Sequence, residues 1–188
     1  MARELITPDL LLAGFDAGKG ALPGSGVPWL QALRAEARER FQALGLPTPK
    51  LESWRYTRLR PFEDTRFRSA TPEDGAISVD VVPALLKSAA VSARIVFMNG
   101  CYRSELSEVG GLPRGVSVEP LSRALGGDSG WIADHLGRIA GETPQTFLAL
   151  NTALMDSGVV LRVGRGTSVE RPIEIVFASG LTDRPIMY

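Results

Sequence analysis

Two β-rich runs near the end of the sequence decide the fold class: Gly158-Val-Val-Leu-Arg-Val-Gly-Arg-Gly166 and Val169-Glu-Arg-Pro-Ile-Glu-Ile-Val-Phe177. Both are rich in β-branched residues, which is typical of strands. Two strands cannot bury both faces of a sheet, and an exposed apolar edge invites pairing with another chain. We therefore expect residues 158–188 to be the incomplete start of a stacked-strand core, and the chain to be a truncated piece that is marginally ordered or forms a homo-oligomer at this edge.

Upstream of these strands, the spacing of apolar residues predicts helices. The clearest covers residues 28–44, because Pro28 suits a first helical turn, apolar residues recur every three or four positions, and Gly45 follows. Shorter helices are expected over residues 9–15, 80–89, 120–125, 128–139 and 143–154.

A hairpin is predicted in the middle of the chain. Two apolar runs, 93–98 and 101–106, flank Asn99-Gly100, which is the strongest short hairpin signal in a sequence. A further strand is expected over 115–119. The sequence thus predicts an α+β protein in three parts: an N-terminal helical region with its connection (1–68), a mixed α/β region with the hairpin near 93–106 (69–157), and the start of the β core (158–188).

Composition excludes several classes of site. The 21 basic residues balance 21 acidic ones, so the chain has no global field for a polyanion. One cysteine, Cys101, and one histidine, His135, cannot form an intrachain disulfide or a complete zinc or iron–sulfur site. The N-terminus shows no signal peptide or membrane span, which favours a cytoplasmic protein without membrane contact.

Short catalytic motifs are weak in this sequence. Gly127-Asp-Ser-Gly130 resembles the nucleophile tetrapeptide of chymotrypsin-type hydrolases, but Trp131 follows it and His135 lies on the wrong side of the serine. The interpretation we favour is a helix-capping loop. His135 and Cys101 are interpreted as structural residues, and no phosphate-binding loop occurs. We assign no catalytic, cofactor-binding or metal-binding residue and do not expect an enzyme.

Residues 50–68 form the best candidate for a binding patch. Six basic residues against three acidic ones are interleaved here with aromatic residues. Such a pattern can stack bases and hold phosphates, or it can pin a connection onto a core or a protein partner. We favour packing or a protein contact over nucleic acid, and single out Trp54, Arg55 and Tyr56.

Three longer stretches resemble one family, the SufB/SufD scaffold proteins of the Suf iron–sulfur cluster assembly system, and match the SufD type best in order and spacing. They are Gly45-Leu-Pro-Thr-Pro-Lys-Leu-Glu-Ser-Trp-Arg-Tyr-Thr-Arg-Leu59, Phe97-Met-Asn-Gly-Cys-Tyr-Arg-Ser-Glu-Leu-Ser107, and Phe147-Leu-Ala-Leu-Asn-Thr-Ala-Leu-Met-Asp-Ser-Gly-Val-Val-Leu-Arg-Val163 with Arg171-Pro-Ile-Glu-Ile175.

The resemblance implies an N-terminal helical region that leads into the first rungs of a right-handed parallel β-helix, formed here by residues 159–163 and 173–177. It implies an accessory scaffold subunit that pairs with a SufB-like scaffold and a SufC-like ABC ATPase, while the complex handles the cluster. The family's cluster-site histidine and its ATPase-docking segment would lie beyond this sequence, so His135 is not given that role. The alternative function that the residues themselves leave open is that of a nucleic-acid or protein-binding module that uses residues 50–68.

Overall fold

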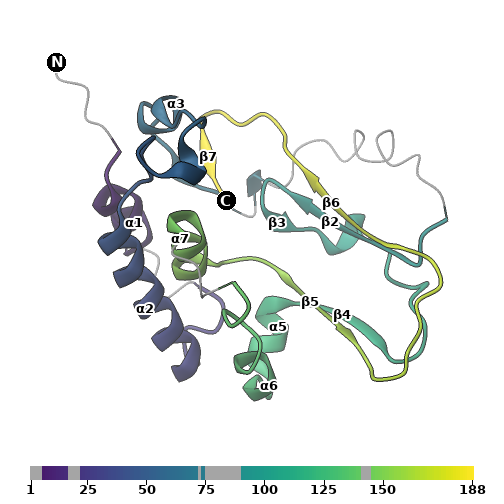
Figure 1. The fold of residues 1–188 in the computed structure, drawn as a ribbon. Helices are drawn as coiled ribbons and strands as arrows, with labels where there is room; N and C mark the ends of the chain where they lie inside the picture. Colours follow the sequence, from purple (N-terminus) through teal and green to yellow (C-terminus); the bar gives the residue numbers. More distant parts are fainter. Residues whose placement is uncertain (1–5, 17–21, 72, 75–89, 141–144) are drawn as a thin grey trace. The chain divides into compact units, whose positions relative to one another are not determined.

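A computed structural model describes residues 6–16, 22–71, 73–74, 90–140 and 145–188 (Figure 1). Helices and small sheets both contribute, which confirms the α+β class. The chain divides into two compact units, each made of two segments: residues 1–68 with 125–156, and residues 69–124 with 157–188. The three-part division expected from the sequence stays a prediction, and the helix expected over 80–89 lies outside the described residues.

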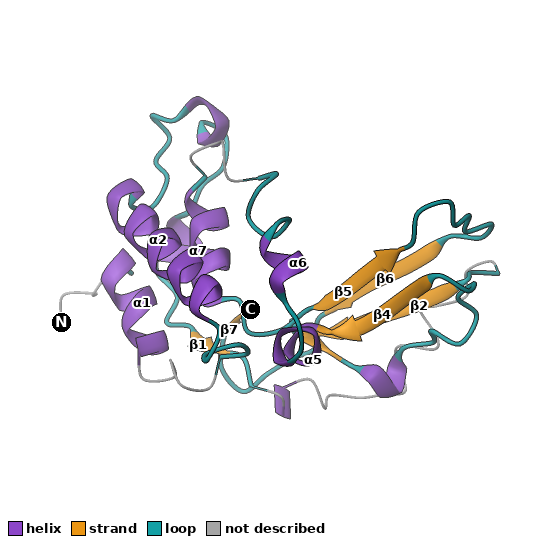
Figure 2. Cartoon of the chain, turned by 90° about the horizontal axis from the view of Figure 1, so that it is seen from below, coloured by secondary structure: helices purple, strands orange, loops and turns teal. Residues whose placement is uncertain are grey.

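The first unit is built around helix α2 (Pro28–Leu44), which packs against α1 (Pro8–Asp16) and α7 (Thr146–Leu154) (Figure 2). Pro28 occupies the first turn of α2, and the N–H of Gly45 donates to the carbonyl of Phe41 at 3.0 Å. Gly45 has φ 65°, a left-handed conformation that glycine adopts freely. Local sequence signals therefore set both ends of α2, and the helices predicted over 28–44 and 9–15 are confirmed.

Alanines lie on the buried faces of both α2 and α7. The buried face of α2 carries Leu30, Ala37 and Phe41, and that of α7 carries Ala149 and Ala153. Small side chains let the helices approach closely, while the larger ones fill the remaining space.

The helix expected over 128–139 is wrong in length. Helix α6 covers only Gly130–Ala133, and turns follow it through Arg138. Gly137 adopts φ 76°, which a regular helix does not permit, and Ile139 is 93% exposed rather than part of an apolar stripe. The apolar spacing in this stretch was therefore misleading, because a left-handed glycine interrupts it.

The second unit holds a three-stranded sheet of order β3-β2-β6. Strands β2 (Ala93–Met98) and β3 (Cys101–Tyr102) form the predicted antiparallel hairpin, with Asn99 and Gly100 at φ 47° and 79°. Positive φ at both positions fits the turn type that matches strand twist. The hairpin is therefore confirmed, but its second strand is shorter than the apolar run 101–106, because the 3₁₀ helix η4 (Ser104–Leu106) follows it.

Strand β6 (Ile173–Ala178) pairs in parallel with β2, from Ala93 opposite Ile173 to Met98 opposite Ala178. All six residues of β2 are buried. Val96 and Met98 pack on one face with Val176 and Ala178, whereas Phe97 stacks on Phe177 at a centroid distance of 5.1 Å. The core of the second unit thus lies around β2, the central strand of this sheet.

The remaining strands form two pairs. Strand β4 (Val116–Pro120) pairs antiparallel with β5 (Val159–Val163), and β1 (Arg68–Ser69) pairs with β7 (Ile186–Met187). The short helix α5 (Leu121–Gly126) follows β4, close to the helix expected over 120–125. Strands β5 and β6 are therefore confirmed as strands, but each pairs with an earlier strand rather than with the other. The β-helix part of the fold prediction stays a prediction.

Candidate protein-interaction site

An aromatic cluster in the first unit fixes the segment singled out from the sequence. The ring of Trp54 lies 5.3 Å from that of Phe147 on α7, and Phe62 meets the same ring edge-on at 5.6 Å. Phe67 lies 5.1 Å from Phe62. Offset and edge-to-face ring pairs of this kind stabilise beyond their buried area. Trp54 therefore packs onto a helix within its own unit.

Residues 50–58, which we call the 50–58 turn, form an irregular segment with local backbone hydrogen bonds. The 3₁₀ helix η2 (Glu52–Trp54) lies at its centre, and the short helix α3 (Arg60–Glu63) follows it. The N–H of Trp54 donates to the Leu51 carbonyl at 2.9 Å, and the N–H of Thr57 donates to the Trp54 carbonyl at 3.0 Å. The turn is thus held by its own hydrogen bonds as well as by the Trp54 ring.

The other two residues singled out from the sequence face solvent. Tyr56 is 89% exposed, and the Arg55 guanidinium carbon lies 5.7 Å from the centre of its ring. Such a cation–π pair is stabilising even at an exposed site. The structure therefore separates the three residues: Trp54 points into the unit, whereas Arg55 and Tyr56 are presented outward.

The basic residues of the patch are also mostly outward. Lys50, Arg55 and Arg58 are exposed and form no ion pair with any residue that the structure describes. Arg60 pairs with Asp64 at 3.4 Å. The exposed surface of the 50–58 turn is therefore positively charged.

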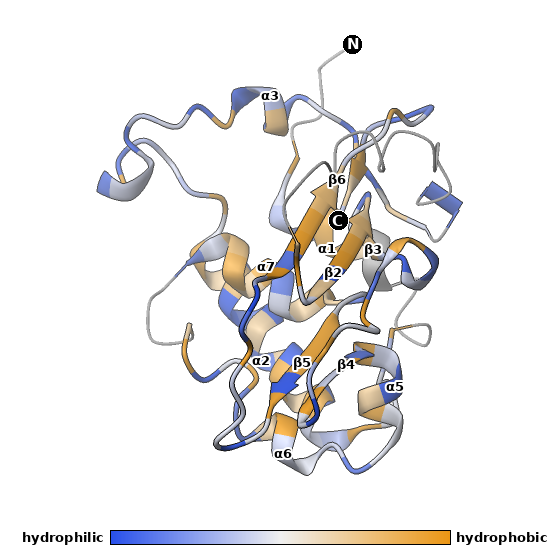
Figure 3. Ribbon diagram, turned by 90° about the vertical axis from the view of Figure 1, so that its right-hand side faces the viewer, coloured by the Kyte–Doolittle hydropathy of each residue, from blue (hydrophilic) through white to orange (hydrophobic). Residues whose placement is uncertain are grey.

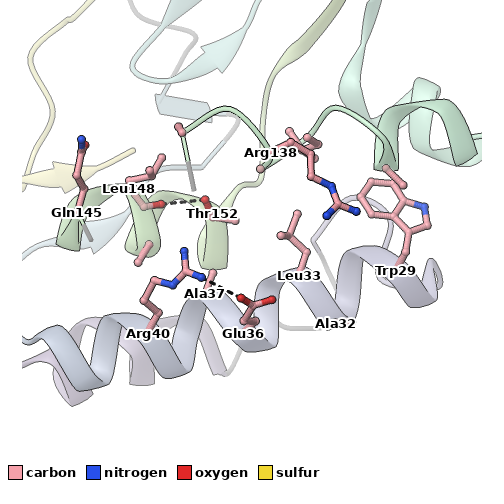
Figure 4. Close-up of a pocket in the computed structure, with 15 residues that line it drawn as sticks. Trp29, Ala32, Leu33, Glu36, Ala37, Arg40, Arg138, Gln145, Leu148 and Thr152 are labelled. Atoms are coloured by element: carbon pink, nitrogen blue, oxygen red, sulfur yellow. Dashed lines mark hydrogen bonds and ion pairs between the residues drawn. The ribbon is translucent and has the colours of Figure 1, made fainter. Parts of the chain in front are cut away.

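A cavity of about 460 Å³, which no sequence pattern predicted, lies between α2, α7 and residues 133–140 (Figure 4). Its apolar wall includes Trp29, Leu33 and Leu148. Among its polar side chains, Arg40 pairs with Glu36 at 2.9 Å, and the Thr152 hydroxyl donates to the Leu148 carbonyl at 2.9 Å. The lining residues come from segments about a hundred residues apart, so no local motif signals this cavity.

A buried arginine ties α2 to the end of α7. Arg34 is 8% exposed, and its terminal nitrogen donates to the Met155 carbonyl at 2.6 Å, just beyond the last turn of α7. A cation at the C-terminus of a helix is favourable. Burial lowers the pKa of Arg34, and the nearby Asp156 carboxylate opposes that shift. Arg34 therefore has a structural role, linking α2 to the end of α7, rather than a role as an acid or base.

Ser129 and Cys101 have structural surroundings, whereas His135 is exposed in the turn that follows α6. The Ser129 hydroxyl accepts a hydrogen bond from the Trp29 indole at 3.3 Å, and Asp128 accepts from the Gly130 N–H at 3.3 Å. Cys101 donates to the Thr71 carbonyl at 3.6 Å. Among the described residues, no group of three or more His, Cys, Asp and Glu side chains lies close enough together to hold a metal ion. No helix in the described part of the chain is long and apolar enough to span a membrane.

Strands β5 and β6 present apolar side chains to solvent. Leu161 and Val163 on β5 are 40% and 48% exposed, and Ile175 and Phe177 on β6 are 48% and 74% exposed. The hydropathy colouring shows the apolar run along β6 beside that of β2 (Figure 3). Both strands are last in their sheets as described, so each has an edge without a described partner. Exposed apolar strands at a sheet edge are typical of surfaces that pair with further chain.

The described features are those of an α+β chain with an anchored basic turn and with strands that expose apolar side chains. The chain is a member of the SufBD family: the family model described as the SufBD protein N-terminal region matches residues 11–175. An iron–sulfur cluster assembly SufBD family protein of Synechocystis sp. is 28% identical over 156 residues. That match covers 82% of this chain and 33% of the relative, so this chain spans about a third of its length. The family resemblance seen in the sequence is confirmed.

Proposed function

We propose that this chain is the leading part of an accessory, SufD-type scaffold subunit of a cytoplasmic Suf iron–sulfur cluster assembly complex. It pairs with a SufB-like scaffold and a SufC-like ATPase, and has no catalytic activity of its own. The observation that carries this proposal is membership of the SufBD family over residues 11–175. The relative from Synechocystis sp. is itself named for iron–sulfur cluster assembly.

The roles of the family-like stretches support a scaffold. Within the 45–59 stretch, Trp54 packs on Phe147, which opens the third stretch. Within the 97–107 stretch, Asn99 forms the hairpin turn, and its side chain bonds to two other segments. The contacts of these two stretches thus hold structural elements together.

The exposed strands support a β-helix that continues beyond this portion. We propose that β5 and β6 are its first rungs, because each has an edge with no partner among the described strands and exposed apolar residues that a following coil would cover. A repeat architecture needs about three stacked units before it is stable. On this proposal, Ile175 and Phe177 become buried in the longer chain.

The iron–sulfur cluster is the cargo of the assembly. Thiolates are the usual cluster ligands, and the sequence has a single cysteine. We therefore assign cluster building to the assembled subunits, with this portion contributing support and contacts.

Co-purification tests the proposal. The longer natural chain, carrying a tag, is co-expressed with the SufB-like scaffold and the SufC-like ATPase of the same organism and purified through that tag. We expect all three proteins to elute together at a fixed stoichiometry on size exclusion. In the matched control, the SufB-like scaffold carries the tag and is expressed in cells that lack this protein. Separate elution of the three proteins contradicts the proposal.

The structure gives less support to the alternative of a nucleic-acid module. Single-stranded nucleic acid is held by successive exposed rings along a basic groove. Of the aromatic residues in 50–68, Trp54, Phe62 and Phe67 pack in the cluster, and only Tyr56 is largely exposed. Salt-sensitive binding of a single-stranded oligonucleotide that depends on Arg55 and Arg58 would revive this alternative.

A further inference from the structure

The backbone of the 50–58 turn is held in a fixed arrangement. Its backbone bonds include the Leu51 N–H to the Thr48 carbonyl at 3.0 Å and the Arg55 N–H to the Glu52 carbonyl at 3.2 Å. The Trp54 ring, 5.3 Å from that of Phe147, fastens the turn to helix α7. A preorganised surface loses little conformational freedom when a partner binds. The turn is therefore prepared for contact rather than in need of ordering.

Two of the side chains that it presents, Tyr56 and Arg55, are of types that dominate protein interfaces. Tyr56 is 89% exposed and Leu51 is 51% exposed, although both could bury considerable apolar area. The Arg55 guanidinium lies over the Tyr56 ring, 5.7 Å from its centre. Tyrosine and arginine are enriched among the residues that carry most of the binding energy at interfaces. A ring this exposed buries little area within its own chain and is accessible to another molecule.

The charge of the turn indicates the chemistry of that molecule. Residues 50–58 contain three basic residues, Lys50, Arg55 and Arg58, and one acid, Glu52. The three basic residues form no ion pair with any described residue. Complementary charge guides association and suppresses wrong partners. The matching surface is therefore acidic.

A protein fits these features better than a nucleic acid does. The chain as a whole carries no net charge, so it lacks a broad phosphate-binding field. The turn offers one exposed ring next to an exposed leucine, and a leucine contributes to an apolar pocket contact rather than to backbone phosphate binding.

We propose that the 50–58 turn docks onto an acidic surface of another protein subunit of the same assembly. Tyr56 inserts as the anchor, Leu51 packs beside it, and Arg55 and Arg58 pair with carboxylates around it. This inference rests on the proposed function, because the partner is a member of that assembly.

Site-specific photocrosslinking tests the docking site. Tyr56 is replaced by p-benzoylphenylalanine in the longer natural chain, and the complex with the SufB-like scaffold and the SufC-like ATPase is purified before irradiation. We expect one crosslinked product with another subunit, mapped by mass spectrometry to a segment rich in Asp and Glu. The matched control places the same photoreactive residue at Ile139, which is 93% exposed in the same unit, and should give no such product.

Charge reversal provides a second measurement. Arg55→Glu combined with Arg58→Glu should lower the crosslinking yield from position 56 at least about tenfold, in line with the loss of two complementary charges. Arg165→Glu, at an exposed turn of the second unit, should leave the yield unchanged.

The outcomes separate the two proposals. If the complex purifies intact but position 56 gives no crosslink, or crosslinks to its own chain, to a second copy or to nucleic acid, the docking site is refuted and the scaffold function stands. A product that maps to a neutral or basic segment also refutes it. If the complex does not form, the proposed function fails and the docking site fails with it.

Discussion

Replacement of Asn99 by alanine should loosen the pairing of β2 with β6. The Asn99 side chain is 1% exposed, donates to the Asp74 carbonyl at 2.8 Å and accepts from the Gly180 N–H at 2.8 Å. Two buried hydrogen bonds contribute about 2 kcal/mol together. Because φ is 47° here, an alanine adds about 1 kcal/mol of left-handed strain. The expected loss is about 3 kcal/mol.

A glycine at the same position separates the two contributions. Asn99→Gly removes both hydrogen bonds but tolerates the left-handed backbone, so the expected loss is about 2 kcal/mol. Asn151→Ala, at an exposed position of α7, is the matched control and should have no such effect.

Amide hydrogen exchange across β2 and β6 measures these losses in the intact chain. Since about 1.4 kcal/mol corresponds to a factor of ten, exchange should speed up about 100-fold for Asn99→Ala and about 30-fold for Asn99→Gly. If both variants exchange at the wild-type rate, the side-chain bonds do not hold the sheet. If the two variants exchange equally fast, the strain argument is wrong.

Three further predictions concern other parts of the molecule. Phe147→Ala removes the ring on which Trp54 packs and should lower the free energy of unfolding by about 2 kcal/mol, because the site is half-buried. Urea denaturation followed by tryptophan fluorescence measures this loss, and an unchanged midpoint contradicts it. Ile175→Lys should reduce self-association of this 188-residue chain, because it places a charge on β6, which has no described partner at its outer edge. Light scattering measures self-association, and an equal value for the variant would count against that edge as the contact. Hydrogen bonds from its own backbone N–H and from Arg103 lower the pKa of Glu105. The stability that Glu105 contributes is therefore present above its ordinary pKa of 4.5 and is lost as pH falls through the lowered value; Glu105→Gln should flatten acid unfolding below pH 4.5, and an unchanged profile would exclude this contribution.

Only part of the candidate site could be predicted from the sequence. The mixture of arginines and aromatic residues in 50–68 indicated a candidate patch that includes Trp54, Arg55 and Tyr56, because such residues either bind a partner or pack onto a core. The pattern could not tell which rings turn inward, since that depends on Phe147, which lies almost a hundred residues away. The cavity beside α2 gave no signal at all for the same reason.

The misjudged helix shows where local patterns stop being sufficient. Apolar spacing from Trp131 to Ile139 suggested a helix, but Gly137 in a left-handed conformation ends the regular backbone. A glycine is compatible with both outcomes in a sequence, and packing in the unit decides between them.

The amino-acid order alone determined the helix over 28–44, the Asn99-Gly100 hairpin and the existence of strands β5 and β6, because helix ends, turns and strand character depend on residues close together in the chain. Tertiary structure alone decided the partners: β6 lies in parallel beside β2, β5 lies antiparallel beside β4, and Trp54 packs on α7. Arg94 and Glu174, eighty positions apart, become an ion pair with 2.7 Å between nitrogen and oxygen through that pairing. Neighbouring residues carry no information about such distant choices, because many alternative pairings satisfy the same local pattern and only burial of the whole unit distinguishes them.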